Sequence, residues 1–259
     1  MVRELGPGEA VIISENGIRS YLWPAGNGKR ALCVFEHIYL ARPDSVLDNR
    51  LVYSARKAMG AQLAKAHPVD ADVVIGVPDS ASAAAVGYSV ESGIPYSDGL
   101  VKNRFVGRTF MQPNQTMWDE GVRLKFNTLA DIIKGKRVVL VDDSIVRGTT
   151  TVHIVGLIRR AGATEVHMRV CAPPIRWPCY MGVDMSTREE LIASHRSVEE
   201  IRQFIGVDTL GYLSVSQLLK AVQSSGGGYC DACFTGRYPV PVQLGLMDKL
   251  MLEHSEQHV

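Results

Sequence analysis

Hydrophobic and polar positions follow two different spacings along this chain. Residues 71–77 and 136–141 are mainly apolar, a pattern typical of strands buried on both faces of a parallel sheet. Residues 48–66 carry apolar side chains at helical spacing and stop before Pro68, which predicts a helix. The first of these strands leads through a polar loop to a helix expected at 83–93. The second leads through a polar loop to a helix expected at 151–162, and a further strand is expected at 165–174. This order predicts an α/β fold, a parallel sheet flanked by helices with ligands at the carboxyl ends of its strands.

The two ends of the chain carry other patterns. Near the N-terminus, two apolar segments flank Glu-Asn-Gly at residues 15–17, and the Asn-Gly pair predicts a tight hairpin. After residue 184 the pattern becomes more helical: Thr187 and Glu190 have the spacing of a capping box, and residues 214–228 predict a short helix that ends in glycines. We expect a single domain, 1–259, with a hairpin segment at 1–30, a core at 31–184 and a helical C-terminal extension at 185–259.

Composition excludes several classes of protein. The chain has 259 residues, 46% of them hydrophobic, which is enough to bury a large core. Its 28 Lys and Arg residues nearly balance its 27 Asp and Glu residues, so no charge excess indicates nucleic acid or an anionic membrane as a partner. The sequence shows neither a signal peptide nor an apolar stretch long enough for a membrane span, which predicts a cytoplasmic protein.

The loop after the strand at 136–141 combines two kinds of polar group. Asp142 and Asp143 are adjacent, so ionising both is costly unless cations or hydrogen-bond donors face them. Mg²⁺ takes oxygen ligands and is commonly held through one or two carboxylates plus phosphate oxygens. Residues 147–150, Arg-Gly-Thr-Thr, lead into a helix whose first N–H groups favour an anion. This loop suits a phosphorylated sugar with magnesium; the alternative is a solvated turn before an ordinary helix start.

Residues 138–150, VVLVDDSIVRGTT, resemble the signature with which type I phosphoribosyltransferases bind phosphoribosyl diphosphate (PRPP). The motif DDSIVRGTT is similar to the corresponding motif of the glutamine PRPP amidotransferase family, which performs the first committed step of purine synthesis. The resemblance covers roughly residues 1–240. Further motifs follow the order of that family: EHIYLARPDS (36–45), VIGVPDSASAAAVGY (74–88), GLVKNRFVGRTFMQPNQ (99–115), GVRLKFN (121–127), PPIRWPCYMGVDM (173–185), TREELIA (187–193) and YCDACFTGRYP (229–239).

The resemblance implies roles for individual residues in the loop. Asp142 and Asp143 would contact the ribose hydroxyls and the magnesium ion. The 5-phosphate would be held by the rest of the loop and by the start of the helix that follows, namely Ser144, Arg147, Gly148, Thr149 and Thr150. These roles agree with the polarity of the loop, which is acidic in its first half and suited to an anion in its second.

Two other segments would handle the diphosphate. Asp79 and Ser80 follow Pro78 in the family's diphosphate loop, and Ala81 stands where some relatives have a serine assigned to the metal. Residues 99–115 match the loop that closes over PRPP, with Phe105 in place of the usual tyrosine. The cationic residues of that loop would neutralise diphosphate as the C–N bond forms, and we expect these to be catalytic: Lys102, Arg104 and Arg108.

Five cysteines are spread over the chain, and their odd number without a secretory signal argues against a disulfide framework. Cys230 and Cys233 form a C-x-x-C pair, which alone is compatible with a metal, redox chemistry or chance. Cys33 and Cys179 lie where the iron–sulfur branch of the amidotransferase family carries cluster cysteines, so the resemblance implies a 4Fe-4S cluster on the four thiolates. Zinc on the same ligands and plain reduced thiols stay open, and Cys171 is expected to be a buried strand thiol.

The implied reaction is attack of ammonia on C1 of PRPP, which displaces diphosphate and gives 5-phosphoribosylamine. The family normally carries a glutaminase half that begins with a cysteine nucleophile, and this sequence has no N-terminal cysteine. We therefore expect the ammonia to be free or to come from a separate glutaminase subunit, and the family habit is a homo-oligomer. Two alternatives stay open: another type I phosphoribosyltransferase that uses a nucleobase, and a non-catalytic PRPP-binding regulator of transcription.

Overall fold

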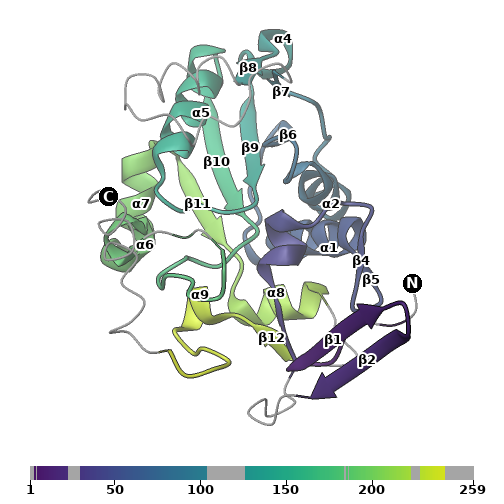
Figure 1. Ribbon diagram of the computed structural model, residues 1–259. Helices are drawn as coiled ribbons and strands as arrows, with labels where there is room; N and C mark the ends of the chain where they lie inside the picture. Colours follow the sequence, from purple (N-terminus) through teal and green to yellow (C-terminus); the bar gives the residue numbers. More distant parts are fainter. Residues whose placement is uncertain are drawn as a thin grey trace, which may run out of the picture.

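A four-stranded parallel sheet lies at the centre of the computed structural model, which describes residue 3 and residues 5–22, 30–103, 126–183, 185, 187–222 and 228–242 (Figure 1). The strand order is β11-β10-β9-β6, with the bounds Val73–Gly76 for β6, Arg137–Asp142 for β9, Glu165–Val170 for β10 and Thr209–Tyr212 for β11. The predicted strands are confirmed, although β6 and β10 are shorter than the segments that predicted them. Because the strands are parallel, their carboxyl ends meet at one edge of the sheet.

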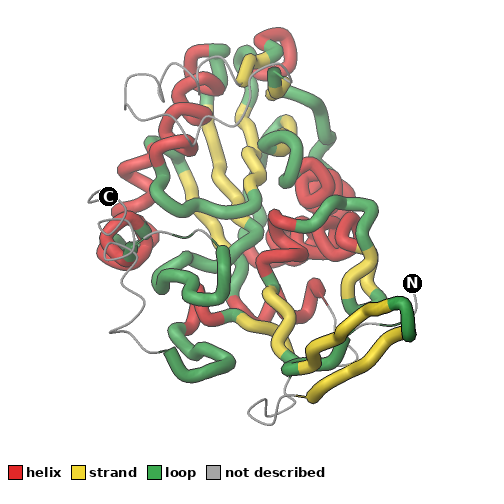
Figure 2. Tube along the Cα trace, viewed as in Figure 1, coloured by secondary structure: helices red, strands yellow, loops and turns green. Residues whose placement is uncertain are grey.

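Helices cover both faces of this sheet (Figure 2). On one side, α1 (Val52–Ala66), α2 (Ser82–Ser92) and α8 (Val215–Val222) contribute to one buried hydrophobic cluster. On the other side, α5 (Thr149–Arg160) and α7 (Val198–Ile205) contribute to a second. β9 supplies the two clusters alternately, as Val139 and Val141 belong to the first and Val138 and Leu140 to the second. A strand covered on both faces is apolar at successive positions, and the expected α/β fold class is confirmed.

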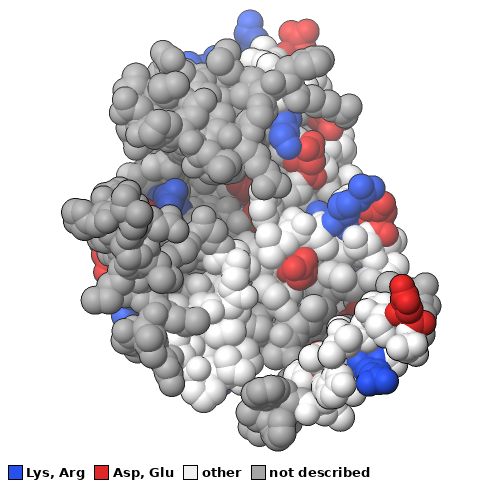
Figure 3. Space-filling model, in the orientation of Figure 1, with Lys and Arg blue, Asp and Glu red and all other residues white. Residues whose placement is uncertain are grey.

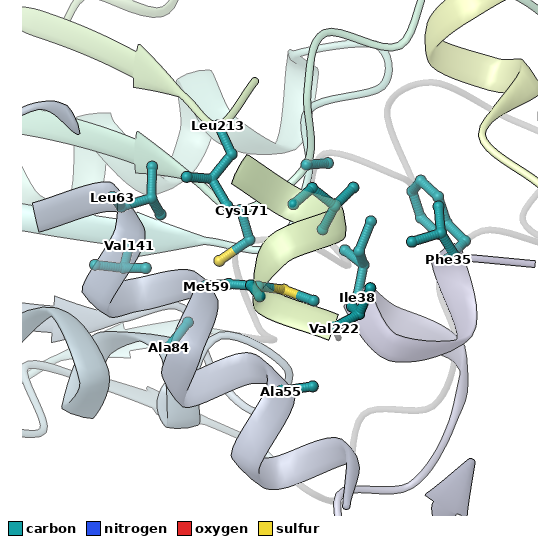
Figure 4. Close-up of a cluster of buried hydrophobic side chains, with 14 of the residues drawn as sticks. Phe35, Ile38, Ala55, Met59, Leu63, Ala84, Val141, Cys171, Leu213 and Val222 are labelled. Atoms are coloured by element: carbon teal, nitrogen blue, oxygen red, sulfur yellow. The ribbon is translucent and has the colours of Figure 1, made fainter. Parts of the chain in front are cut away.

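The first cluster joins segments that are far apart in the sequence (Figure 4). Met59 and Leu63 of α1 lie near Val141, Leu213 and Cys171, and Cys171 is only 2% exposed. α1 and α2 approach so closely that a Cβ on Gly60 of α1 would lie 1.8 Å from the carbonyl oxygen of Ala84 in α2. Only glycine allows this backbone contact.

The predicted helix at 48–66 begins later than expected. Residues before α1 instead form a small antiparallel pair, β4 (Val46–Leu47) and β5 (Arg50–Leu51). The turn between these strands places Asp48 and Asn49 at positive φ angles of 51° and 59°. Asp and Asn tolerate this left-handed conformation better than most residues, so the Asp-Asn pair favours a turn over the first helical turn that the apolar spacing predicted.

The predicted capping box at Thr187 is wrong. Residues Arg188–Glu190 form a 3₁₀ helix, η3, and the Thr187 side chain makes no capping hydrogen bond. Leu191 is extended and fully buried, which ends η3 before α6 (Ile192–His195) begins. A capping box occurs ten residues later, where Ser197 Oγ accepts from the N–H of Glu200 at 3.3 Å and the Glu200 carboxylate accepts from the N–H of Ser197 at 2.7 Å.

The N-terminal hairpin is confirmed as β1 (Glu9–Ser14) paired with β2 (Gly17–Leu22), and it lies at the periphery in Figure 1. The remaining short elements are β3 (Ala31–Cys33), the π-helix η1 (Glu36–Leu40), β7 (Leu100–Lys102), β8 (Phe126–Thr128), α4 (Ala130–Ile133), β12 (Gly228–Cys230) and α9 (Ala232–Thr235). β3 pairs with β12 in parallel, and β7 pairs with β8 in an antiparallel hairpin. The first pairing brings the C-x-x-C segment beside Cys33.

The segment that we expected to be a C-terminal extension contributes to the core. β11 is a strand of the central sheet, and α8 packs against α1. Side chains of both charges are interspersed on the face shown in Figure 3, in keeping with the balanced composition. Within the described residues, none of the helices has the length and hydropathy that a membrane span requires.

Candidate active site

Asp142 and Asp143 lie at the carboxyl edge of the central sheet. Asp142 is the last residue of β9, and β9 lies between β6 and β10. The carbonyl oxygens of the two aspartates accept from the N–H groups of Cys171 at 3.0 Å and Ala172 at 2.8 Å, which fixes the backbone at the strand end. Both side chains belong to nearly buried residues, 8% and 9% exposed. The strand end therefore fixes the backbone from which the two carboxylates project.

A hydrogen bond joins this acidic pair to the loop after β6. Ser80 Oγ donates to Asp143 Oδ2, and Ser144 Oγ donates to Asp143 Oδ1 at 2.5 Å. The N–H of Asp143 donates to Asp142 Oδ1 at 2.8 Å. The loop that carries Ser80 begins with a cis peptide bond between Pro78 and Asp79. The two loops predicted to hold the ribose and the diphosphate thus meet at one carboxylate.

Burial makes the acidic pair unfavourable when both members are ionised. The pKa of Asp142 is raised well above its usual range, first by burial and then by the neighbouring Asp143. Burial also raises the pKa of Asp143, although hydrogen bonds from Ser144 and Ser80 and the positive charge of Arg56 oppose the rise. A bound cation would stabilise the charged forms. The residue types are those that hold Mg²⁺ together with waters and ligand oxygens.

The predicted 5-phosphate loop ends in a helix start. Gly148 has a φ of 81°, which favours glycine, and α5 begins at Thr149, two residues before the expected position. Ile145 anchors the loop in the core at 2% exposure, while Arg147 lies outside and donates to Glu190 at 2.9 Å. The first N–H groups of a helix have no partner within it, so Thr149 and Thr150 present donors suited to a phosphate.

One of the three predicted catalytic cations lies beside the diphosphate loop. Lys102 ends β7, and its Nζ lies 2.8 Å from Oδ2 of Asp79. Lys102 is therefore close to the predicted diphosphate position. Arg104 and Arg108, with Phe105 between them, lie outside the described residues.

The four cysteines predicted to bind a cluster come from segments that the fold brings together. Cys33 and Cys230 are paired positions of β3 and β12. Cys233 lies in α9, and its carbonyl oxygen accepts from the N–H groups of Arg176 and Trp177, just before Cys179. Burial raises the pKa of the Cys33 and Cys233 thiols, and the other thiols of the group raise it further. Cys33, Cys179, Cys230 and Cys233 are below called the thiol group.

Among the described residues, no three His, Cys, Asp or Glu side chains lie close enough to hold a single metal ion. A tetrahedral zinc site with Zn–S bonds near 2.3 Å would need sulfurs about 3.8 Å apart. In a cubane cluster each cysteine binds a different iron, so its sulfurs lie further apart. A cluster and zinc at the thiol group both stay predictions.

Two residues without a predicted role at the site interact with it, Arg56 through its charge and Glu190 through an ion pair. Arg56 is 4% exposed in α1, where it donates to the carbonyl oxygens of His37 at 3.0 Å and Ala41 at 2.9 Å, and its charge lowers the pKa of Asp143. An arginine on the apolar face of a predicted helix was the available signal. Glu190 was noted, but as a capping residue, and the structure pairs it with Arg147 instead.

Comparison with known proteins identifies close relatives. Amidophosphoribosyltransferase of Bacillus subtilis is 54% identical over 245 residues, 93% of this chain and 51% of the relative. The enzymes of that name from Archaeoglobus fulgidus and Synechococcus elongatus are 54% identical over 243 residues and 51% identical over 253 residues, and they are covered to 53% and 51%. The chain thus spans about half the length of the curated relatives it matches.

Solved structures give the same result. The glutamine PRPP amidotransferase from B. subtilis complexed with ADP and GMP superimposes with a TM-score of 0.83 at 53% identity, over 94% of this chain and 54% of that chain. A model of the phosphoribosyl transferase domain family matches residues 44–180, more than half of the chain. The matched range includes both Ser80 and Asp143, at which the two loops of the candidate site meet. The chain therefore belongs to the phosphoribosyl transferase domain family.

Proposed function

We propose that this chain is the phosphoribosyltransferase part of an amidophosphoribosyltransferase, which makes 5-phosphoribosylamine and diphosphate from PRPP and ammonia in the first step of purine synthesis. The observation that carries the proposal is the link from Ser80 to Asp143, which joins a diphosphate loop to an acidic ribose loop. More than 50% identity to curated amidophosphoribosyltransferases over nearly the whole chain favours ammonia over a nucleobase or a regulatory role.

In the proposed reaction, the C1–N bond forms as the C1–O bond to diphosphate breaks, and the surplus proton of the new ammonium group is lost to water. A transition state of this kind places positive charge on the ribose and negative charge on the leaving group. Asp142 and Asp143 face the ribose side, while Lys102 and the backbone of residues 78–80 face the diphosphate. We assign no nucleophilic residue, because the acceptor itself attacks.

The acidic pair supports magnesium as the cation bound together with the substrate. When bound, Mg²⁺ would neutralise the carboxylates and the diphosphate oxygens. Ser80 and Ser144 would keep Asp143 oriented, because both hydroxyls donate to its carboxylate. Arg56 would supply a second positive charge from the buried side. Ala81 offers no side-chain oxygen, so we assign the metal only to Asp142 and Asp143.

We further propose that Cys33, Cys179, Cys230 and Cys233 hold a 4Fe-4S cluster with a structural role. Their convergence from three segments of the chain supports this proposal, as does the raised pKa of the Cys33 and Cys233 thiols, which a bound metal would offset. Brown protein with stoichiometric iron and sulfide after anaerobic purification is the expected result. Zinc without iron would contradict it. The glutaminase partner, the homo-oligomer and the cytoplasmic location stay predictions.

Diphosphate release by the purified chain tests the function. With PRPP, Mg²⁺ and ammonia we expect release of diphosphate together with formation of 5-phosphoribosylamine. With glutamine as the only nitrogen source, the rate should depend on an added glutaminase. Nucleobases in place of ammonia test the alternative that the chain is a nucleobase phosphoribosyltransferase. Diphosphate release that requires a purine or pyrimidine base, with no release in the presence of ammonia, would refute the proposal.

A further inference from the structure

The 3₁₀ helix η3 and the start of α6 contact the predicted phosphate loop from outside. Glu190 Oε2 accepts from Arg147 Nη2 at 2.9 Å. Two residues further on, the N–H of Ile192 donates to the carbonyl oxygen of Val146 at 2.9 Å. An ion pair and a backbone hydrogen bond thus attach consecutive residues of the loop to a segment more than forty positions later in the chain.

An apolar contact completes this attachment. A Cβ placed on Gly148 would lie 3.0 Å from Cδ1 of Ile192 and 3.2 Å from Cε1 of Phe204, so the Gly148 backbone rests directly on these two side chains. The guanidinium carbon of Arg196 lies 4.5 Å from the centre of the Phe204 ring, which helps to fix that ring. Residues 146–148 are therefore supported by three different kinds of contact.

The segment that carries Glu190 is itself well anchored. Leu191 is fully buried, and Ser194 Oγ donates to the carbonyl oxygen of Arg188 at 2.6 Å. The Arg188 guanidinium carbon lies 4.4 Å from the centre of the Trp177 ring. Because the backbone on both sides of Glu190 is held, its carboxylate has few alternative positions. It can therefore restrain Arg147 more effectively than a residue on a free loop.

We propose that Glu190 is a positioning residue for the phosphoribosyl ligand: through Arg147 it holds residues 144–150 in the conformation that receives the 5-phosphate. This inference rests on the proposed function. A phosphate at a helix start is bound by N–H groups whose directions depend on the loop backbone. A loop already in the binding conformation loses less conformational freedom on binding. Because Glu190 lies against Arg147 and not among the groups assigned to the reacting C1 atom, it affects binding of PRPP and leaves the chemical step unchanged.

The variant Glu190→Gln tests the inference, with Glu189→Gln as its matched control. Both carboxylates are exposed in η3, but among the described residues only Glu190 is placed in an ion pair with the loop. Exposed ion pairs contribute up to about 1 kcal/mol, which corresponds to at most about a fivefold change in affinity. We expect Glu190→Gln to raise the KM of PRPP, and its Kd measured with Mg²⁺ but without ammonia, about threefold. Both variants should keep kcat within about twofold of the parent value.

A double variant separates positioning from direct contact. Arg147→Gln should weaken PRPP binding, and adding Glu190→Gln to it should cause no further change, because Glu190 acts only through Arg147. An unchanged or lowered KM in Glu190→Gln, or a further rise in the double variant, would overturn the inference. Failure of the parent chain to bind or turn over PRPP would instead refute the proposed function, so the two failures are distinguishable.

Discussion

The acidic pair and the thiol group are two places where the fold brings like acids together, and they differ in their surroundings. Burial raises the pKa of Asp142 and Asp143 at the first place and of Cys33 and Cys233 at the second. At the acidic pair, two serine hydroxyls and the Arg56 charge oppose the rise for Asp143. At the thiol group, the other thiols add to the rise for Cys233. Side-chain hydrogen bonds and a positive charge thus oppose the effect of burial on Asp143, whereas only backbone hydrogen bonds oppose it at Cys33 and Cys233.

This difference bears on how each site would bind the metal proposed for it. A carboxylate that is already hydrogen-bonded can exchange a magnesium ion with each round of substrate binding. Thiols whose pKa is raised by burial stay protonated unless a metal binds them. The acidic pair is thus suited to catalysis, and the thiol group to holding β12 and α9 against β3. Three substitutions and one control substitution test this comparison.

Asp143→Ala should have the largest effect. It removes the carboxylate that Ser80 and Ser144 contact and that we propose faces the ribose and the metal. We expect PRPP-dependent diphosphate release to fall at least about a hundredfold, in the range seen when a group that stabilises transition-state charge is lost. A thermal melt should show an intact fold. Turnover near that of the parent chain would contradict the assignment.

Cys233→Ser should have an intermediate effect, this time on stability. Cys233 is 8% exposed, and in a metal-bound thiol group its loss would release the metal together with part of the folding free energy. Loss of about 2 to 3 kcal/mol corresponds to a Tm that is lower by about 5 to 10 °C in a chain of this size. Iron and sulfide content should fall with it.

Cys171→Ala is the control for this experiment, since Cys171 lies in the hydrophobic cluster under α1 and outside the thiol group. Its iron and sulfide content should match that of the parent. If the parent contains no metal and Cys233→Ser melts at the same temperature, the thiols are reduced and structural, and the proposed cluster is excluded.

Asp142→Asn should have the smallest effect. It should raise the Tm, whereas Cys233→Ser lowers it. Burial and Asp143 raise the pKa of Asp142, so the folded chain binds a proton there more tightly than the unfolded chain. The stability from that proton is present at low pH and is lost as the pH rises through the folded pKa. The neutral Asn avoids this loss while its Oδ1 can still accept from the N–H of Asp143. We expect a Tm about 2 to 4 °C above that of the parent at pH 7.

The difference in Tm between Asp142→Asn and the parent should depend on pH and on magnesium. Near pH 4, the usual range of an aspartic acid, the parent and Asp142→Asn should melt at similar temperatures. Magnesium should raise the Tm of the parent more than that of the variant, because the parent keeps both carboxylates. A variant that melts below the parent at neutral pH would show that an ionised Asp142 is stabilised by contacts that outweigh its burial.

Prediction from the sequence succeeded where one local signal dominated. The apolar runs of β6, β9 and β10, the Asn-Gly hairpin and the glycine that ends α2 at Gly93 were all identified, because buried strands and left-handed glycines leave strong patterns. It failed at Thr187 and Glu190, where the spacing fits a capping box but the burial of Leu191 interrupts the helix. Packing of one leucine outweighed the local preference.

The sequence by itself determined the type of fold and the chemistry of the main loop, because both depend on neighbours in the chain. Two aspartates after a buried strand and a glycine before a helix are local features. Only the tertiary structure decided which distant residues complete the site: Ser80 bonds to Asp143, the charge of Arg56 acts on Asp143, and Glu190 pairs with Arg147. These contacts depend on how the elements pack, and no spacing along the chain encodes them.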